Sequence, residues 1–169
     1  MAFKAGAKEF LSSQMDRLRI PEEEREGFIK NIYDWSRQVR QIESDDNPLA
    51  SPENTTAKGV YQFVDPSVPV GKQRMLNMGV SADLVNKMSD NPQKWTNPQA
   101  DAIFLANIFG QDESDSYLKN IGAGDLQARQ DAYYRYHHTA PDDATIKRVA
   151  RLMPTLEDNV VHEQGSEAF

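Results

Sequence analysis

The clearest pattern along the chain is a stripe of apolar residues that ends beside a glutamate. The stripe has the spacing of an α-helix and consists of Phe28, Ile32, Trp35, Val39 and Ile42. Because successive helical residues are rotated by about 100°, Glu43 lies about 60° from the centre of the stripe, at its edge rather than on the solvent face. The pattern predicts an amphipathic helix from Pro21 to Glu43 that ends in a partly buried carboxyl group.

Further apolar repeats predict short helices through the rest of the chain, with Ser81, Asn97 and Asp125 as caps. Their approximate ranges are 3–19, 72–79, 81–88, 97–110, 114–121, 125–138 and 141–152. Turn-forming residues fill positions 45–58, and a short β-prone segment follows at 59–63. The expected fold is therefore mainly α, with about eight helices and one small β element. A single domain is expected over residues 1–155, followed by a polar tail or linker at 156–169.

Composition narrows the class of protein. A chain of 169 residues with 38% hydrophobic and 27% charged residues is ordinary for one globular domain. The net charge of −7 argues against general nucleic-acid binding, and the lack of cysteine excludes disulfides and thiolate chemistry. No apolar stretch reaches the length of a membrane span, and the charged residues near Met1 argue against a signal peptide.

Glu43 is the main candidate for chemistry. Partial burial and the negative end of the helix dipole both penalise a carboxylate, so both are expected to raise the pKa of Glu43. A glutamic acid that keeps its proton near neutral pH is suited to general acid catalysis.

Three short motifs follow one another in the order of a known family. They are Glu43-Ser44 with Asn47-Pro48, then Gly59-Val60-Tyr61-Gln62, and finally Ala132-Tyr133-Tyr134. In this order they resemble the soluble-type lytic transglycosylases, which share a lysozyme-like fold with goose-type lysozymes. The resemblance extends from about Trp35 to Tyr136. It departs from the family pattern at Tyr134, where the family has Asn. Without the Asn amide, the sugar contacts on that side of the expected binding groove could be altered, or the activity reduced.

The resemblance implies a lysozyme-like fold and a role for each matched residue. Glu43 would donate a proton to the glycosidic oxygen between N-acetylmuramic acid and N-acetylglucosamine, then accept one from the 6-hydroxyl to give a 1,6-anhydro product. No cofactor or metal is implied. The residues expected to bind or orient the glycan, or to position Glu43, are Ser44, Gly59, Gln62, Tyr133 and Tyr134.

The polar residues allow two other interpretations. A hydrolase with two acids would need a second carboxylate, and the candidates are Asp45, Asp46, Glu53 and Asp65. All four lie in turn-rich sequence, where acidic residues usually accept backbone hydrogen bonds. His137 and His138 suggest a metal site, but adjacent helical residues point about 100° apart, and a helix C-terminus favours imidazolium without any metal.

The leading hypothesis is a lytic transglycosylase that acts on the glycan strands of peptidoglycan. A hydrolytic muramidase and a non-catalytic wall-binding or virion module on the same fold stay open as alternatives. Because no export signal is expected, the sequence favours a phage-encoded protein that acts on the host wall at infection or lysis. Such a protein would reside in the virion, with tail or other virion proteins as partners, or in the host cytoplasm before it reaches the wall.

Overall fold

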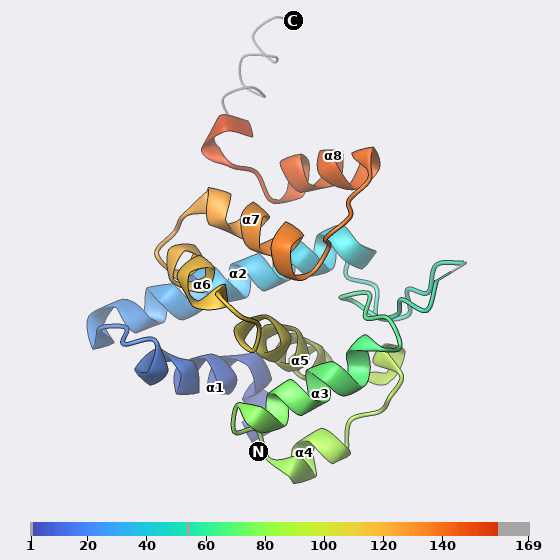
Figure 1. Ribbon diagram of the computed structural model, residues 1–169, viewed down its shortest axis with the longest axis horizontal. Helices are drawn as coiled ribbons and strands as arrows, with labels where there is room; N and C mark the ends of the chain where they lie inside the picture. The colour runs from blue at the N-terminus through green and yellow to red at the C-terminus, as the bar shows by residue number, and fades with distance from the viewer. Residues whose placement is uncertain (1, 54, 159–169) are drawn as a thin grey trace, which may run out of the picture.

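α-Helices make up most of residues 2–53 and 55–158, the part of the chain that this computed structural model describes (Figure 1). They are α1 (Ala2–Arg17), α2 (Arg25–Ser44), α3 (Ser67–Asn77), α4 (Ala82–Asn86), α5 (Asn97–Phe109), α6 (Ser114–Gly122), α7 (Leu126–Tyr136) and α8 (Asp143–Leu152). Short 3-10 helices cover Glu22–Glu24 and Pro92–Lys94. The expected mainly α fold with about eight helices is confirmed. Most of the predicted tail, residues 159–169, lies outside the described residues.

Helix α5 forms the buried centre of the fold (Figure 1). Its sequence is apolar on nearly every side, as expected for a helix that other elements cover all round. Helices α1 and α3 pack directly against it. Its N-terminal cap is Thr96 and not the predicted Asn97. The Thr96 hydroxyl accepts from the backbone N–H of Gln99, and the side-chain oxygen of Gln99 accepts from the backbone N–H of Thr96.

Helix α2 matches the predicted stripe, and all five apolar residues of that stripe are buried. The helix follows the 3-10 turn after Pro21 and ends at Ser44, where Asp45 adopts a left-handed backbone with φ of 54°. Arg148 of α8 donates to the carbonyl oxygens of Gln41 and Ile42 at this end. These bonds satisfy acceptors that a helix end leaves free and hold Glu43 at a fixed place.

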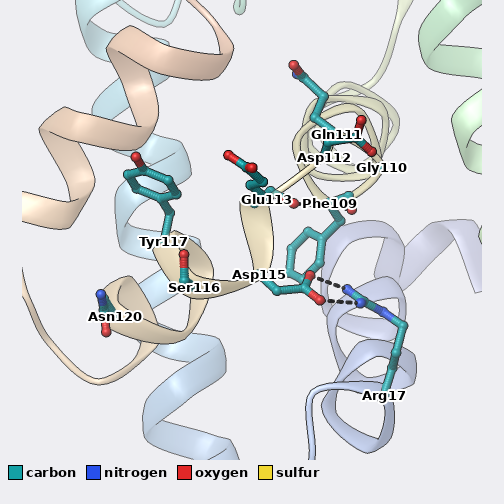
Figure 2. Close-up of a pocket in the computed structure, with 11 residues that line it drawn as sticks. Arg17, Phe109, Gly110, Gln111, Asp112, Glu113, Asp115, Ser116, Tyr117 and Asn120 are labelled. Carbon is teal, nitrogen blue, oxygen red and sulfur yellow. Dashed lines mark hydrogen bonds and ion pairs between the residues drawn. The ribbon is translucent and has the colours of Figure 1, made fainter.

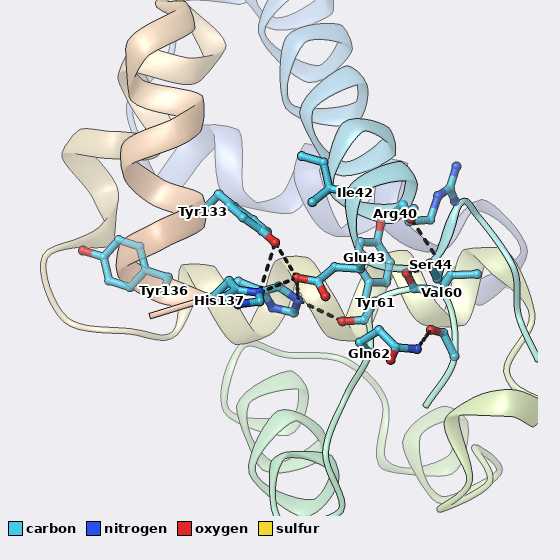
Figure 3. Close-up of polar contacts among 12 residues, drawn as sticks. Arg40, Ile42, Glu43, Ser44, Val60, Tyr61, Gln62, Tyr133, Tyr136 and His137 are labelled. Atoms are coloured by element: carbon cyan, nitrogen blue, oxygen red, sulfur yellow. Dashed lines mark hydrogen bonds and ion pairs between the residues drawn. The ribbon is translucent and has the colours of Figure 1, made fainter. Parts of the chain in front are cut away.

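The predicted β element is reduced to one antiparallel bridge between Lys58 and Phe63. The four residues between them form a tight turn, closed by a bond from the Gln62 N–H to the Gly59 carbonyl oxygen. This turn lies beside the C-terminal end of α2 (Figure 3). Within the described ranges, none of the helices has the length and apolar character needed to cross a bilayer.

Candidate active site

The Glu43 carboxyl group lies where α2, the end of α7 and the turn at 59–62 meet (Figure 3). Its side chain is only 10% exposed. Oε1 accepts a hydrogen bond of 2.6 Å from the Tyr133 hydroxyl, and Nδ1 of His138 lies 3.3 Å away. Nε2 of His137 lies 3.6 Å from the same oxygen. Among the described residues nothing bonds to Oε2, so this oxygen is free to meet a ligand.

The hydrogen-bond partners fix which ring nitrogens carry protons. Nε2 of His137 lies 2.8 Å from the Tyr61 carbonyl oxygen, which can only accept, so Nε2 carries a hydrogen. Nδ1 of His138 lies 3.3 Å from both the Glu43 carboxyl and the Tyr133 oxygen. Because Tyr133 donates its own hydrogen to Glu43, Nδ1 of His138 is the donor to both oxygens.

The pKa of Glu43 is lowered below its ordinary value, so the expected increase is wrong. Burial by itself raises this pKa and is the largest single effect. The hydrogen bond from His138, the electrostatic effect of His137 where that ring is protonated and the hydrogen bond from Tyr133 together outweigh it, since each favours the carboxylate. Glu43 is therefore ionised in the free protein at neutral pH.

The pKa values of the three groups around Glu43 are shifted as well. The hydrogen bond with Glu43 raises the pKa of His138, although burial opposes this. Burial lowers the pKa of His137. Burial and then the Glu43 charge raise the pKa of Tyr133 far above its ordinary value. At neutral pH the group therefore consists of a carboxylate, a neutral phenol, a neutral His137 and a His138 that keeps its proton to higher pH than an ordinary histidine.

Ser44 and Gln62 form bonds within the protein. The Ser44 hydroxyl donates to the Val60 carbonyl oxygen at 2.8 Å, which ties the end of α2 to the turn. The Gln62 amide donates to the Gly59 carbonyl oxygen at 2.8 Å, while its own backbone is left-handed with φ of 55°. Both residues stabilise the wall beside Glu43, and the amide oxygen of Gln62 keeps its capacity to accept from a ligand.

Gly59 is required by the geometry of the turn. Its φ is +80°, and a Cβ at this position would lie 2.9 Å from the backbone oxygen of Pro92. The close contact that requires glycine at this position is thus the one with the Pro92 backbone. At Gly59 the turn packs against the 3-10 helix at Pro92–Lys94.

We expect Gly59→Ala to lower the free energy of unfolding by about 2–3 kcal/mol, because it adds a steric clash to the strain of a left-handed backbone. Gly79→Ala is the matched control, since Gly79 has φ of +91° but open space around it. Strain alone should cost the control about 1 kcal/mol. Urea unfolding measures both, and equal losses would contradict the role given to the Pro92 contact.

Tyr134, which replaces the family Asn, lies against the ring of Tyr133 with 5.4 Å between ring centroids. It is partly exposed, and no hydrogen bond joins it to Glu43 within the described part of the chain. Tyr134 therefore contacts Tyr133, and Tyr133 in turn contacts the Glu43 carboxyl group.

His137 and His138 are the site residues that the sequence interpretation missed. That interpretation applied helical spacing to both, but α7 ends at Tyr136, and His137 has the non-helical angles φ −125° and ψ −54°. Both rings can therefore turn toward Glu43. One signal was present, because His137 lies four residues after Tyr133 and thus on the same helical face.

None of the four candidate second carboxylates lies in this cluster. Three have exposed carboxyl groups that form ion pairs elsewhere: Asp45 with Arg148, Asp46 with Arg40, and Asp65 with Lys58. Glu53 is exposed. Over residues 2–53 and 55–158, no three histidine or acidic side chains are arranged to hold a metal ion. The described site thus contains a single carboxyl group with two imidazoles and a phenol.

A buried network supports the site from behind. Asp101 of α5, which is 1% exposed, accepts from the Tyr61 hydroxyl at 2.5 Å, from Arg40 at 2.8 Å and from the Tyr33 hydroxyl at 3.1 Å. The Tyr61 ring also stacks on Phe104 at 4.3 Å. Since the Tyr61 carbonyl holds His137, the network fixes one of the three groups around Glu43.

Comparisons of this chain with models of known protein families, with curated proteins and with solved structures found no match. The case for function therefore rests on the residues around Glu43.

Two surface hollows lie away from this cluster. One, of about 810 Å³, is lined by Arg17, residues 109–117 and Asn120, and Figure 2 shows Arg17 paired with Asp115 at its edge. The other, of about 660 Å³, lies between the end of α1, the start of α2 and the end of α6. Neither is lined by Glu43 or by a residue that bonds to it. The candidate chemistry therefore belongs to the cluster around Glu43.

Proposed function

We propose that this chain cleaves the glycan strands of peptidoglycan as a lytic transglycosylase, with Glu43 as acid and then base. The observation that carries the proposal is the state of the Glu43 carboxyl group. It is 10% exposed, held through Oε1 by Tyr133 and His138, and free at Oε2. A carboxyl group fixed at one oxygen and open at the other is suited to directional proton transfer.

The single carboxyl group supports a transglycosylase over a hydrolase with two acids. In the proposed reaction Glu43 protonates the leaving oxygen, and the N-acetyl carbonyl of the substrate assists at the anomeric carbon. The resulting carboxylate then removes the proton of the 6-hydroxyl as the anhydro ring closes. No second carboxylate is needed, which agrees with the positions of the four acidic residues described above.

The acid form of Glu43 must be made available when the glycan binds. Because burial disfavours the charged carboxylate, exclusion of water by a bound sugar acts toward protonation. Ser44 and Gln62 hold the adjacent wall, and the amide oxygen of Gln62 would accept from a sugar hydroxyl or amide. That the protein is phage-encoded and acts with virion proteins on the host wall stays a prediction from the sequence.

Mass spectrometry of the fragments from digested peptidoglycan tests the reaction. We expect products that end in 1,6-anhydro-N-acetylmuramic acid, because the 6-hydroxyl takes the place of water. Reducing ends would identify a muramidase instead. Intact glycan strands after prolonged incubation would favour the non-catalytic wall-binding module.

A further inference from the structure

Glu43 and His138 form a hydrogen-bonded pair of titratable groups. Nδ1 of His138 lies 3.3 Å from Oε1 of Glu43, and the Tyr133 hydroxyl contacts both groups. His137 faces the pair from the end of α7. The negative charge of Asp142, at the start of α8, favours the charged form of His138. Arg148 of α8 lies against the C-terminal end of α2, and its positive charge favours ionisation of Tyr133. His138 is thus the cation hydrogen-bonded to Glu43.

The coupling between these two groups is reciprocal. The charge of His138 stabilises the Glu43 carboxylate by the same free energy with which the carboxylate stabilises the imidazolium. This agrees with the directions of the two pKa shifts, lowered for Glu43 and raised for His138. At mildly acidic pH the free protein therefore holds one proton in this pair, on His138 and not on Glu43.

We propose that His138 is a positioning residue whose charged form keeps Glu43 ionised in the free protein, so that His138 sets the pH range in which Glu43 acts as an acid. This role rests on the proposed function, because it needs a reaction that uses the Glu43 proton. His138 itself acts through Glu43 and needs no contact with the glycan.

The proton balance of the reaction closes within the pair. His138 releases one proton to water and Oε2 of Glu43 takes one up, so the pair keeps its single proton. Glu43 then transfers that proton to the glycosidic oxygen as the bond from the anomeric carbon breaks. The carboxylate recovers a proton from the 6-hydroxyl as the new carbon–oxygen bond forms. Charge held on His138 opposes both steps in which the Glu43 carboxylate takes up a proton, and favours the step in which Glu43 gives its proton to the glycosidic oxygen.

The test is the pH dependence of the initial rate of peptidoglycan cleavage by the wild type and by His138→Asn. Asn keeps an N–H donor near the position of Nδ1 but carries no charge. An opposite charge in contact shifts a carboxyl pKa by about 1–3 units, so we expect the variant to be about tenfold faster at mildly acidic pH. The two rates should converge at alkaline pH, where His138 is neutral in the wild type. A variant that is slower by one factor at every pH, or unchanged, would overturn the proposal.

A second measurement does not depend on activity. The ring of His138 is titrated by NMR in the wild type, in Glu43→Gln and in Glu26→Gln, an exposed residue at the other end of α2. We expect the pKa of His138 to fall in Glu43→Gln and to stay unchanged in Glu26→Gln. An unchanged His138 titration in Glu43→Gln overturns this role alone. Absence of cleavage by the wild type overturns the proposed function and, with it, this role.

Discussion

Glu43→Gln is expected to lower the rate of peptidoglycan cleavage by about a thousandfold, the usual size of a general acid–base contribution. Gln keeps an oxygen that can accept from Tyr133 but has no proton to give to the glycosidic oxygen and cannot take one from the 6-hydroxyl. Both proposed proton transfers fail together. The loss of turbidity of purified peptidoglycan measures the rate.

Glu26→Gln is the control for this experiment, because it makes the same change of side chain on the same helix at an exposed position. We expect it to retain the rate of the wild type. Circular dichroism and thermal unfolding of all three proteins show whether the fold is kept. Equal rates for the wild type and Glu43→Gln would remove Glu43 from the mechanism.

The helices were predictable because their signals are local. The stripe on α2 repeats for almost the whole helix, and each of its apolar residues is buried as expected. Asp125 caps α7 as predicted and accepts from the N–H groups of Gln127 and Ala128. Helix boundaries were less predictable where two candidate caps are adjacent, as at Thr96 and Asn97, since only the position of Gln99 decides between them.

The surroundings of Glu43 were predictable only in part. Tyr133 was expected near the carboxyl group on the basis of the resemblance, and its hydroxyl does bond to Glu43. The two histidines were missed because their convergence depends on how α7 ends, which helical spacing does not reveal. The direction of the Glu43 pKa was wrong for the same reason. Burial and the helix dipole can be inferred from sequence, whereas the approach of Tyr133, His137 and His138 from the end of α7 and the residues after it cannot.

The buried network behind the site was also beyond sequence reasoning. Arg40 on α2, Tyr61 in the turn and Asp101 on α5 come from three separate stretches, and nothing in their spacing indicates that they meet. In the structure the guanidinium of Arg40 and the carboxyl of Asp101 are both nearly excluded from solvent. The network therefore adds a long-range constraint that fixes the turn against α2 and α5.

Asp101→Asn is expected to lower the free energy of unfolding by about 3 kcal/mol, because it leaves the charge of Arg40 buried without its closest partner. Tyr61 and Tyr33 donate to different oxygens of Asp101, and Asn keeps only one of these acceptors. The variant therefore loses one tyrosine hydrogen bond together with the attraction to Arg40. Arg40 retains the outer contact with Asp46 at 3.2 Å, which keeps the loss at the lower end of the range for broken buried pairs. Urea unfolding monitored by tryptophan fluorescence measures the change.

Asp115→Asn provides a matched control, since Asp115 pairs with Arg17 through two hydrogen bonds but lies at the surface (Figure 2). Its side chain is 49% exposed, so water replaces the lost contact and the expected cost is less than about 1 kcal/mol. The difference between the two variants isolates the effect of burial on one kind of ion pair. Equal losses, or no loss in Asp101→Asn, would show that the Arg40–Asp101 pair does not hold the turn in place. In that case the position of His137 beside Glu43 would depend on its own contacts alone.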